Sequence, residues 1–142
     1  MSFDLPAATY SYLERSATSL REAIIDTDAG MRYAHAHVAA LRATAALLAA
    51  KATPMIAKRG RAPQRNAWVL LAEVAPELAE WATFFSAGAT KRAAAEAGSR
   101  RAVTEREADD LVRDADKFLG LVETYLGLKP HLSVPEQIVF AS

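Results

Sequence analysis

Four side chains that could take part in acid–base or phosphate chemistry lie close together, at Arg32, Tyr33, His35 and His37. Histidine exchanges a proton near neutral pH, and the planar guanidinium of arginine holds a phosphate through paired hydrogen bonds. Cleavage of RNA without a metal needs a base for the 2′-hydroxyl, an acid for the leaving oxygen and a cation at the phosphate, and these side chains could supply them. We therefore take Arg32 and His37 as the candidate catalytic pair, with Tyr33 and His35 as supporting residues.

The spacing of these residues argues against a metal site. His35 and His37 are two positions apart and diverge by about 200° on a helix, so they cannot bind one ion. Neither has an acidic residue or another histidine three or four positions away, and no HExxH or inward-facing Glu-x-x-His pattern is present. Glycine-rich phosphate loops and a GxSxG elbow are also absent. We expect no metal and no cofactor.

Composition predicts an all-α protein. Of the 142 residues, 51% are hydrophobic, a share enlarged by alanine, which is the strongest helix former. The 17 basic and 17 acidic residues balance, so no global field attracts nucleic acid or membrane. Cysteine is absent, which excludes disulfides, thiolate zinc sites and cysteine nucleophiles. No apolar run of about 18 residues could span a bilayer, and we expect a cytoplasmic location.

Apolar residues recur at spacings of three and four in several segments, as in helices with one buried face. A first helix has Pro6 in its first turn and stops near residues 26–30. A second runs from about residue 30 to Lys51, with Asp28 as its N-cap. Their predicted buried stripes are Tyr10, Leu13, Ala17, Leu20 and Ile24, then Ala34, Val38, Leu41, Ala45 and Leu48.

Two further stripes follow. The first starts near Asn66, breaks before Pro76, and includes Trp68, Leu71, Ala75, Leu78, Ala82 and Phe85. The second follows the capping box that Thr104 and Glu107 form, and includes Ala108, Leu111, Ala115, Phe118, Val122 and Tyr125. We expect an up-and-down bundle of four to five helices in one domain, residues 1–142, with a core over about 6–127 and an extended tail over 128–142.

A connector over residues 51–65 contains basic but no acidic side chains. Lys58, Arg59 and Arg61 are the candidate nucleic-acid contacts there. A solvated basic loop is the plainer interpretation, since the connector lacks the interleaved aromatics of a single-strand stacking platform.

The R-Y-A-H-A-H segment, residues 32–37, resembles a motif of a known family. Arginine followed by four residues and histidine is similar to the motif of HEPN domains. The text around it, over about residues 8–126, resembles the small alanine-rich, single-domain HEPN family of high-GC bacteria. The resemblance implies a helical bundle, often a homodimer, and in several members a metal-independent ribonuclease. Ribonuclease members usually place Asn, His or Asp directly after the arginine, where this sequence has Tyr33.

Geometry makes the dimer necessary for catalysis. Arg32 and His37 lie about 140° apart around one helix, so a single helix does not aim both at one phosphate. Two facing helices of a homodimer could combine them, as the resemblance implies. This interpretation predicts a homodimeric protein that binds RNA or another nucleic acid. As an enzyme it would be a metal-independent endoribonuclease.

A second reading stays open, that of a non-catalytic helical-bundle module that binds a protein partner. His37 would then be a half-buried histidine bonded to Tyr33 or Thr44, and Arg32 a solvated or interface arginine. His35 would belong to the polar surface, and Trp68 and Trp81 to the core rather than to a base-stacking platform.

Overall fold

The computed structural model describes residues 4–51 and 66–133, and all the regular structure within these ranges is helical. The elements are α1 (Ala7–Ile25), α2 (Ala29–Lys51), α4 (Ala67–Val74), the 3₁₀ turn η1 (Pro76–Leu78), α5 (Ala79–Ala87), α6 (Ala89–Glu96) and α7 (Glu105–Tyr125). The predicted all-α bundle is therefore confirmed. Candidate sites at Lys58, Arg59 and Arg61 and the apolar tail residues from Val134 onward lie outside the described ranges.

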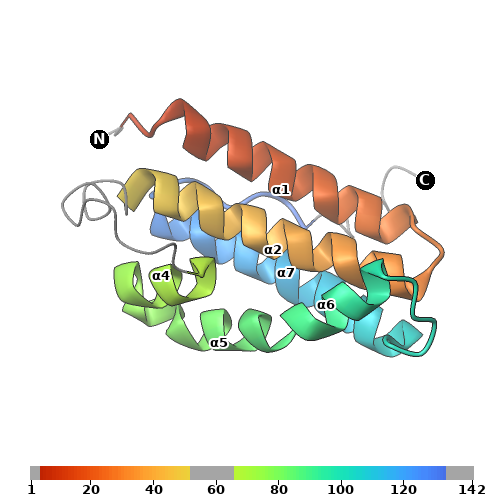
Figure 1. Ribbon diagram of the computed structural model, residues 1–142. Coiled ribbons are helices and arrows are strands. Elements are labelled where there is room, and N and C mark those ends of the chain that lie inside the picture. Colours follow the sequence, from red (N-terminus) through yellow and green to blue (C-terminus); the bar gives the residue numbers. More distant parts are fainter. Residues whose placement is uncertain (1–3, 52–65, 134–142) are drawn as a thin grey trace.

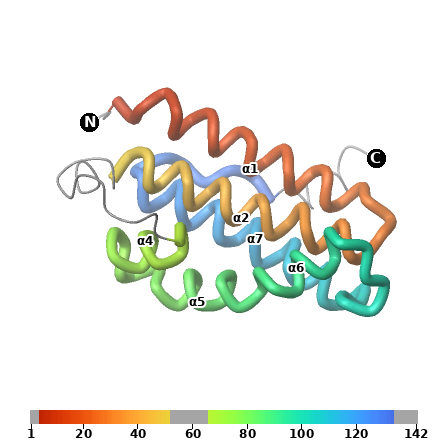
Figure 2. The backbone as a smooth tube through the Cα atoms, in the orientation of Figure 1, coloured from red at the N-terminus to blue at the C-terminus, as the bar shows by residue number. Residues whose placement is uncertain are grey.

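Three long helices dominate the bundle. Figure 1 shows α1, α2 and α7 with roughly aligned axes. Helices α5 and α6 follow one another along the edge of the bundle opposite α1. Helix α2 is central, because it packs against α1, α4, α6 and α7. Figure 2 shows that the chain turns back after the end of α7 and runs alongside this helix. No helix within the described ranges is long and apolar enough to cross a membrane.

The helix boundaries follow the capping chemistry of the sequence. Asp28 accepts a hydrogen bond from the Met31 amide at 2.8 Å and begins α2. Asn66 caps α4, and the side chains and amides of Thr104 and Glu107 form the expected reciprocal box at the start of α7. The chain also breaks before Pro76, as expected, since proline cannot donate the next helical hydrogen bond.

The buried face of α1 includes Leu13 and Leu20 of the predicted stripe but not Tyr10. Tyr10 is 47% exposed, whereas Thr9 and Ser16 are fully buried. Their hydroxyls donate to backbone carbonyls of α2, Thr9 to Ala46 at 2.9 Å and Ser16 to Ala39 at 2.7 Å. Small side chains let the two helices approach closely, and the hydrogen bonds offset the cost of burying the hydroxyls. Thr9 and Ser16 therefore occupy the face of α1 that packs on α2, and Tyr10 faces solvent.

The predicted stripe of α2 is wrong at most positions, for a different reason. Of its five residues only Ala34 is buried. Because α2 has neighbours on several sides, its buried surface wraps around the helix and is made mainly of alanine. The stripe through α4 to α5 is buried at all six predicted positions, and that of α7 at all but Tyr125.

Candidate functional site

His37 lies inside the bundle, with 1% of its surface exposed. Its Nε2 donates to the backbone carbonyl of Phe85 at 2.8 Å. Because a carbonyl can only accept, Nε2 carries the proton and Nδ1 is left as an acceptor. A guanidinium nitrogen of Arg92 lies 3.3 Å from Nδ1 and donates to it. Both ring nitrogens are therefore occupied by other parts of the same chain.

Aromatic rings surround this imidazole. Tyr33 lies parallel to it with a centroid separation of 6.5 Å, and Trp68 and Phe85 meet it edge-on at 5.8 and 6.3 Å. Burial lowers the pKa of His37 below its ordinary value, and the charge of Arg92 lowers it further, against the opposing effect of the Phe85 carbonyl. His37 is thus a neutral core residue rather than a half-buried one bonded to Tyr33 or Thr44.

Gly88 makes the close packing around His37 possible. A Cβ atom at this position would lie 2.6 Å from the Tyr33 hydroxyl and 3.4 Å from a carbon of the His37 ring. Gly88 also separates α5 from α6, which brings the Phe85 carbonyl and the Arg92 side chain to the same imidazole. The sequence offered one signal of this role, a glycine inside an otherwise strongly helical run.

Arg32 faces a different part of the molecule. One of its terminal nitrogens donates to Glu105 and to Asp109 of α7, each at 2.9 Å, and Nε donates to the Asp26 carbonyl at 3.2 Å. The Arg32 side chain is 14% exposed, while the two carboxylates are well exposed. Arg32 therefore fastens the start of α2 to the first turns of α7.

The structure does not bring Arg32 and His37 together within one protomer. Arg32 binds α7 and the turn before α2, whereas His37 binds α5 and α6. Tyr33 does join His37, by ring stacking. His35 joins neither, since its ring nitrogens lie 3.5 Å from Glu22 and 3.6 Å from Asp26, on the outer side of the α1–α2 turn.

The sequence pattern did not predict the contacts of several charged residues near His37. Lys91 forms an ion pair with Glu107, and the Lys91 contact and the Thr104 cap lower the pKa of Glu107 to about 2. Arg92 is bound to Glu96, one turn further along α6, at 3.3 Å. These pairs join α6 to itself and to α7, so each of the two cations already has an anionic partner.

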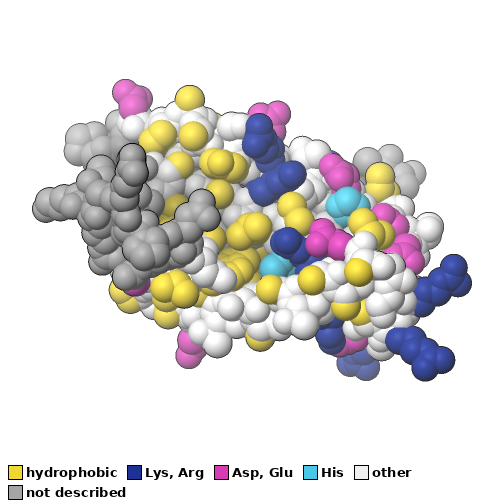
Figure 3. Space-filling view, viewed as in Figure 1, with side chains coloured by type: hydrophobic (Ala, Val, Ile, Leu, Met, Phe, Trp, Pro, Cys, Tyr) yellow, Lys and Arg dark blue, Asp and Glu magenta, His cyan; other side chains and the backbone are white. Residues whose placement is uncertain are grey.

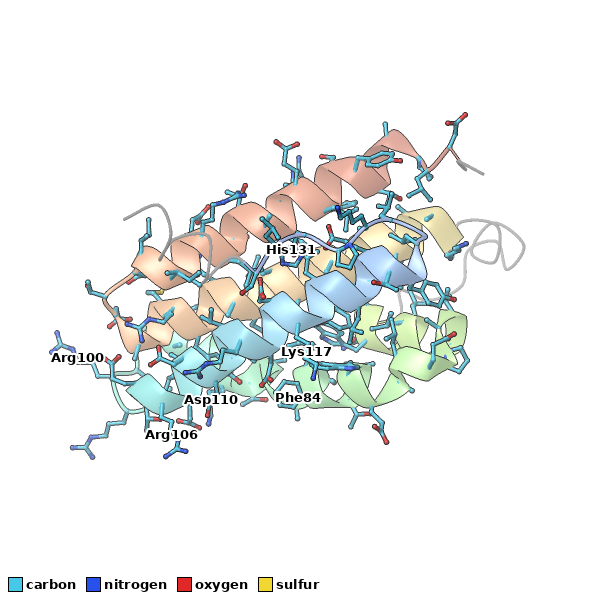
Figure 4. All side chains as sticks on the ribbon, turned by 180° about the vertical axis from the view of Figure 1, so that it is seen from behind. Phe84, Arg100, Arg106, Asp110, Lys117 and His131 are labelled. Atoms are coloured by element: carbon cyan, nitrogen blue, oxygen red, sulfur yellow. The ribbon has the colours of Figure 1, made fainter. Side chains whose placement is uncertain are left out.

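A second polar cluster holds the segment after α7. The ring of His131 bonds Glu123 at 2.5 Å and Asp116 at 2.8 Å, and its amide donates to Glu123 at 3.1 Å. These two carboxylates raise the pKa of His131 to about 9. Figure 4 shows His131 on the returning chain between α1 and α7. The segment up to residue 133 therefore docks on its own chain.

Charges of both signs share the visible surface. In Figure 3 they gather toward the end of the bundle where α6 and α7 meet, while hydrophobic side chains are spread over the middle. Figure 4 shows Arg100 and Arg106 projecting from that end. In the described part of the chain, no group of three or more histidine or acidic side chains is arranged to hold a metal ion.

Comparison with known proteins agrees with the helical architecture. A family model described as SAV_6107-like HEPN matches residues 23–123, which include α2, the Arg32–His37 segment and nearly all of α7. No curated protein and no solved structure matches the chain significantly. Since the family model covers well over half of the 142 residues, the chain belongs to the SAV_6107-like HEPN family.

Proposed function

We propose that this HEPN domain is a non-catalytic protein-interaction module, in which Arg32 and His37 stabilise the bundle. The observation that argues most strongly for a non-catalytic role is the environment of His37. Its side chain is 1% exposed and both ring nitrogens are hydrogen-bonded to other residues of the chain. A general base must come within hydrogen-bond reach of the proton that it removes, and this imidazole offers no free nitrogen to a substrate.

The environment of Arg32 points the same way. A phosphate-binding arginine needs donors directed at the phosphate and a net positive field around it. Here two carboxylates, Glu105 and Asp109, already accept from the guanidinium. An incoming phosphate would have to displace both and would meet their negative charge.

The family supports a second candidate function, which concerns nucleic acid. HEPN domains are generally nucleic-acid-related, and the R-x4-H spacing is present here. In this alternative the protein is a metal-independent endoribonuclease whose site is shared by two protomers of a homodimer. It requires Arg32 to leave Glu105 and Asp109, and the His37 ring to exchange its Phe85 and Arg92 partners for substrate.

An RNA assay separates the two candidates. A mixed, structured RNA pool is incubated in EDTA with the native protein and with His37→Gln, after circular dichroism shows that both are folded. We expect no cleavage by either protein. Cleavage by the native protein that His37→Gln loses while still folded would contradict the proposal and establish the ribonuclease.

Binding to RNA is measured separately, by fluorescence anisotropy at several salt concentrations. Phosphate contacts give an affinity that falls steeply with salt, because counterions are released on binding. We expect no such affinity from an interaction module whose charges balance. Salt-dependent binding without cleavage would replace the protein partner by RNA.

A further inference from the structure

A small pocket opens between α5 and α7, away from the residues around His37. Glu80, Trp81 and Phe84 of α5 and Asp114 of α7 line it, and its volume is about 320 Å³. This volume lies at the small end of the range for ligand sites. Figure 4 shows Phe84 on this side of the bundle, below Lys117 of α7.

The two aromatic rings form a corner. The ring planes of Trp81 and Phe84 meet at 88° with a centroid separation of 6.3 Å. Trp81 is fixed from behind, since it stacks on Phe85 at 5.9 Å and contacts Phe118 at 5.8 Å. Phe84 is 46% exposed, although it is a large apolar side chain. The corner is therefore held in place by the core and left accessible to a ligand.

Asp114 brings negative charge to this corner. It is partly buried, and no hydrogen bond or ion pair to it is present in the described residues. Arg113 forms its ion pair with Asp110, at 3.1 Å, although the charges of Lys117 and Arg113 also act on Asp114 and lower its pKa in part. Burial, and then the charge of Asp110, raise the pKa of Asp114 above its ordinary value. A carboxylate in this position gains more than a solvated one from an arriving positive charge.

The combination of lining groups selects the chemistry of the ligand. Aromatic faces attract cations through their quadrupole, and Glu80 and Asp114 repel anions. Arginine suits such a site better than lysine, because its planar guanidinium stacks on aromatic rings and also donates two parallel hydrogen bonds to a carboxylate. We propose that the α5–α7 pocket binds an arginine side chain of a partner protein, stacked against Trp81 or Phe84 and hydrogen-bonded to Asp114.

This inference rests on the proposed function in one respect, that the partner is a protein. The pocket itself can be tested without the partner and without RNA. Blocked arginine, that is N-acetyl-arginine methylamide, is titrated into the ¹⁵N-labelled full chain, and the indole N–H resonances are followed by NMR. Trp68, which is buried, serves as the internal reference for Trp81. We expect a saturable shift of the Trp81 resonance and a smaller effect from blocked lysine.

Two variants locate the binding. Asp114→Asn and Phe84→Ala should each weaken the affinity for blocked arginine about fivefold or more. Glu14→Gln removes the same charge as Asp114→Asn from an exposed position on α1, and it should leave the affinity unchanged.

Three results would overturn the proposal. The first is the lack of a saturable Trp81 shift with blocked arginine, and the second is equal affinity in Asp114→Asn and Glu14→Gln. The third is a Trp81 shift produced by a short oligoribonucleotide instead of by arginine, which would make this an anion site. Because RNA cleavage is measured in a different assay, the proposed function and the pocket can fail independently.

Discussion

His37 has as its arginine partner Arg92, 55 positions away on α6, with 3.3 Å between the guanidinium and Nδ1. Arg32, the arginine of the R-x4-H motif, is bound to α7 instead. The two motif residues thus tie α2 to different neighbours, His37 to α5 and α6 and Arg32 to α7. This division of contacts is the physical basis for assigning them a structural role.

Replacing His37 should destabilise the fold strongly. His37→Gln leaves a poorly filled site and disturbs the bond to the buried Phe85 carbonyl, which we expect to lower the free energy of unfolding by about 2–4 kcal/mol. Urea unfolding measures the change. The matched control is His35→Gln, on the partly exposed side of the same helix, for which we expect about 0.5 kcal/mol or less. Equal effects of the two substitutions would contradict the buried role.

Part of the pH dependence of the free energy of unfolding should come from His37. Its pKa is lowered in the folded state, so below the unfolded value of about 6.5 the unfolded chain binds more protons. The free energy of unfolding should therefore fall as pH drops below about 6.5, and this part of the fall should be missing in His37→Gln. Parallel pH profiles of the two proteins would be the contrary result.

Much of the fold was predictable from local chemistry. The caps at Asp28 and Thr104, the helix start near Asn66 and the break at Pro76 are decided by residues within one turn, and all four are where the sequence places them. The face of α1 was predictable only in part, because apolar spacing does not show that Thr9 and Ser16 find carbonyl partners on a neighbouring helix. The face of α2 was not predictable, because neighbours on several sides bury small residues all around that helix.

Arg32→Gln tests the link between α2 and α7. The variant loses the charge that holds Glu105 and Asp109, and we expect a loss of about 1–2 kcal/mol that shrinks at high salt. Arg113→Gln is the control, because Arg113 and its partner Asp110 are both exposed. This pair should contribute less than about 0.5 kcal/mol to the free energy of unfolding. If chemical denaturation gave the control the larger effect, Arg32 would not fasten the helices.

Gly88→Ala should destabilise through one contact. The new Cβ would lie 2.6 Å from the Tyr33 hydroxyl, and such overpacking costs about 1–3 kcal/mol. Removing that hydroxyl with Tyr33→Phe should recover most of the loss, which a double-mutant cycle measures by thermal unfolding. Gly120→Ala is the control, since its Cβ meets nothing closer than 3.9 Å. Additive effects at positions 88 and 33 would refute the steric explanation.

His131 should act in the opposite pH direction from His37. Its folded pKa, about 9, lies above the unfolded value near 6.5, so its stabilisation is complete below about 6.5 and is lost as pH rises through 9. At pH 6 we expect His131→Gln to be less stable by on the order of 2 kcal/mol, and at pH 10 the difference should be small. A difference that stayed constant between these pH values would rule out the charged clamp.

The site was less predictable than the fold, because its partners are distant in sequence. No residue within one turn of His37 indicates that Phe85 and Arg92 will be its hydrogen-bond partners. The two carboxylates that bind Arg32 lie more than 70 positions away from it in the sequence. The 140° divergence of Arg32 and His37 did predict that one protomer would separate them. What it could not predict was that each would find a complete set of partners within its own chain.

The most direct test of the structural role is the state of the His37 imidazole in the native protein. Long-range ¹H–¹⁵N NMR reports which ring nitrogen carries the proton at each pH. The account predicts a proton on Nε2, slow exchange with solvent, and a ring that stays neutral to lower pH than an ordinary histidine, because burial lowers its pKa. A His37 ring that exchanges freely with water and titrates near pH 7 would contradict it and return the residue to the role of a catalytic base.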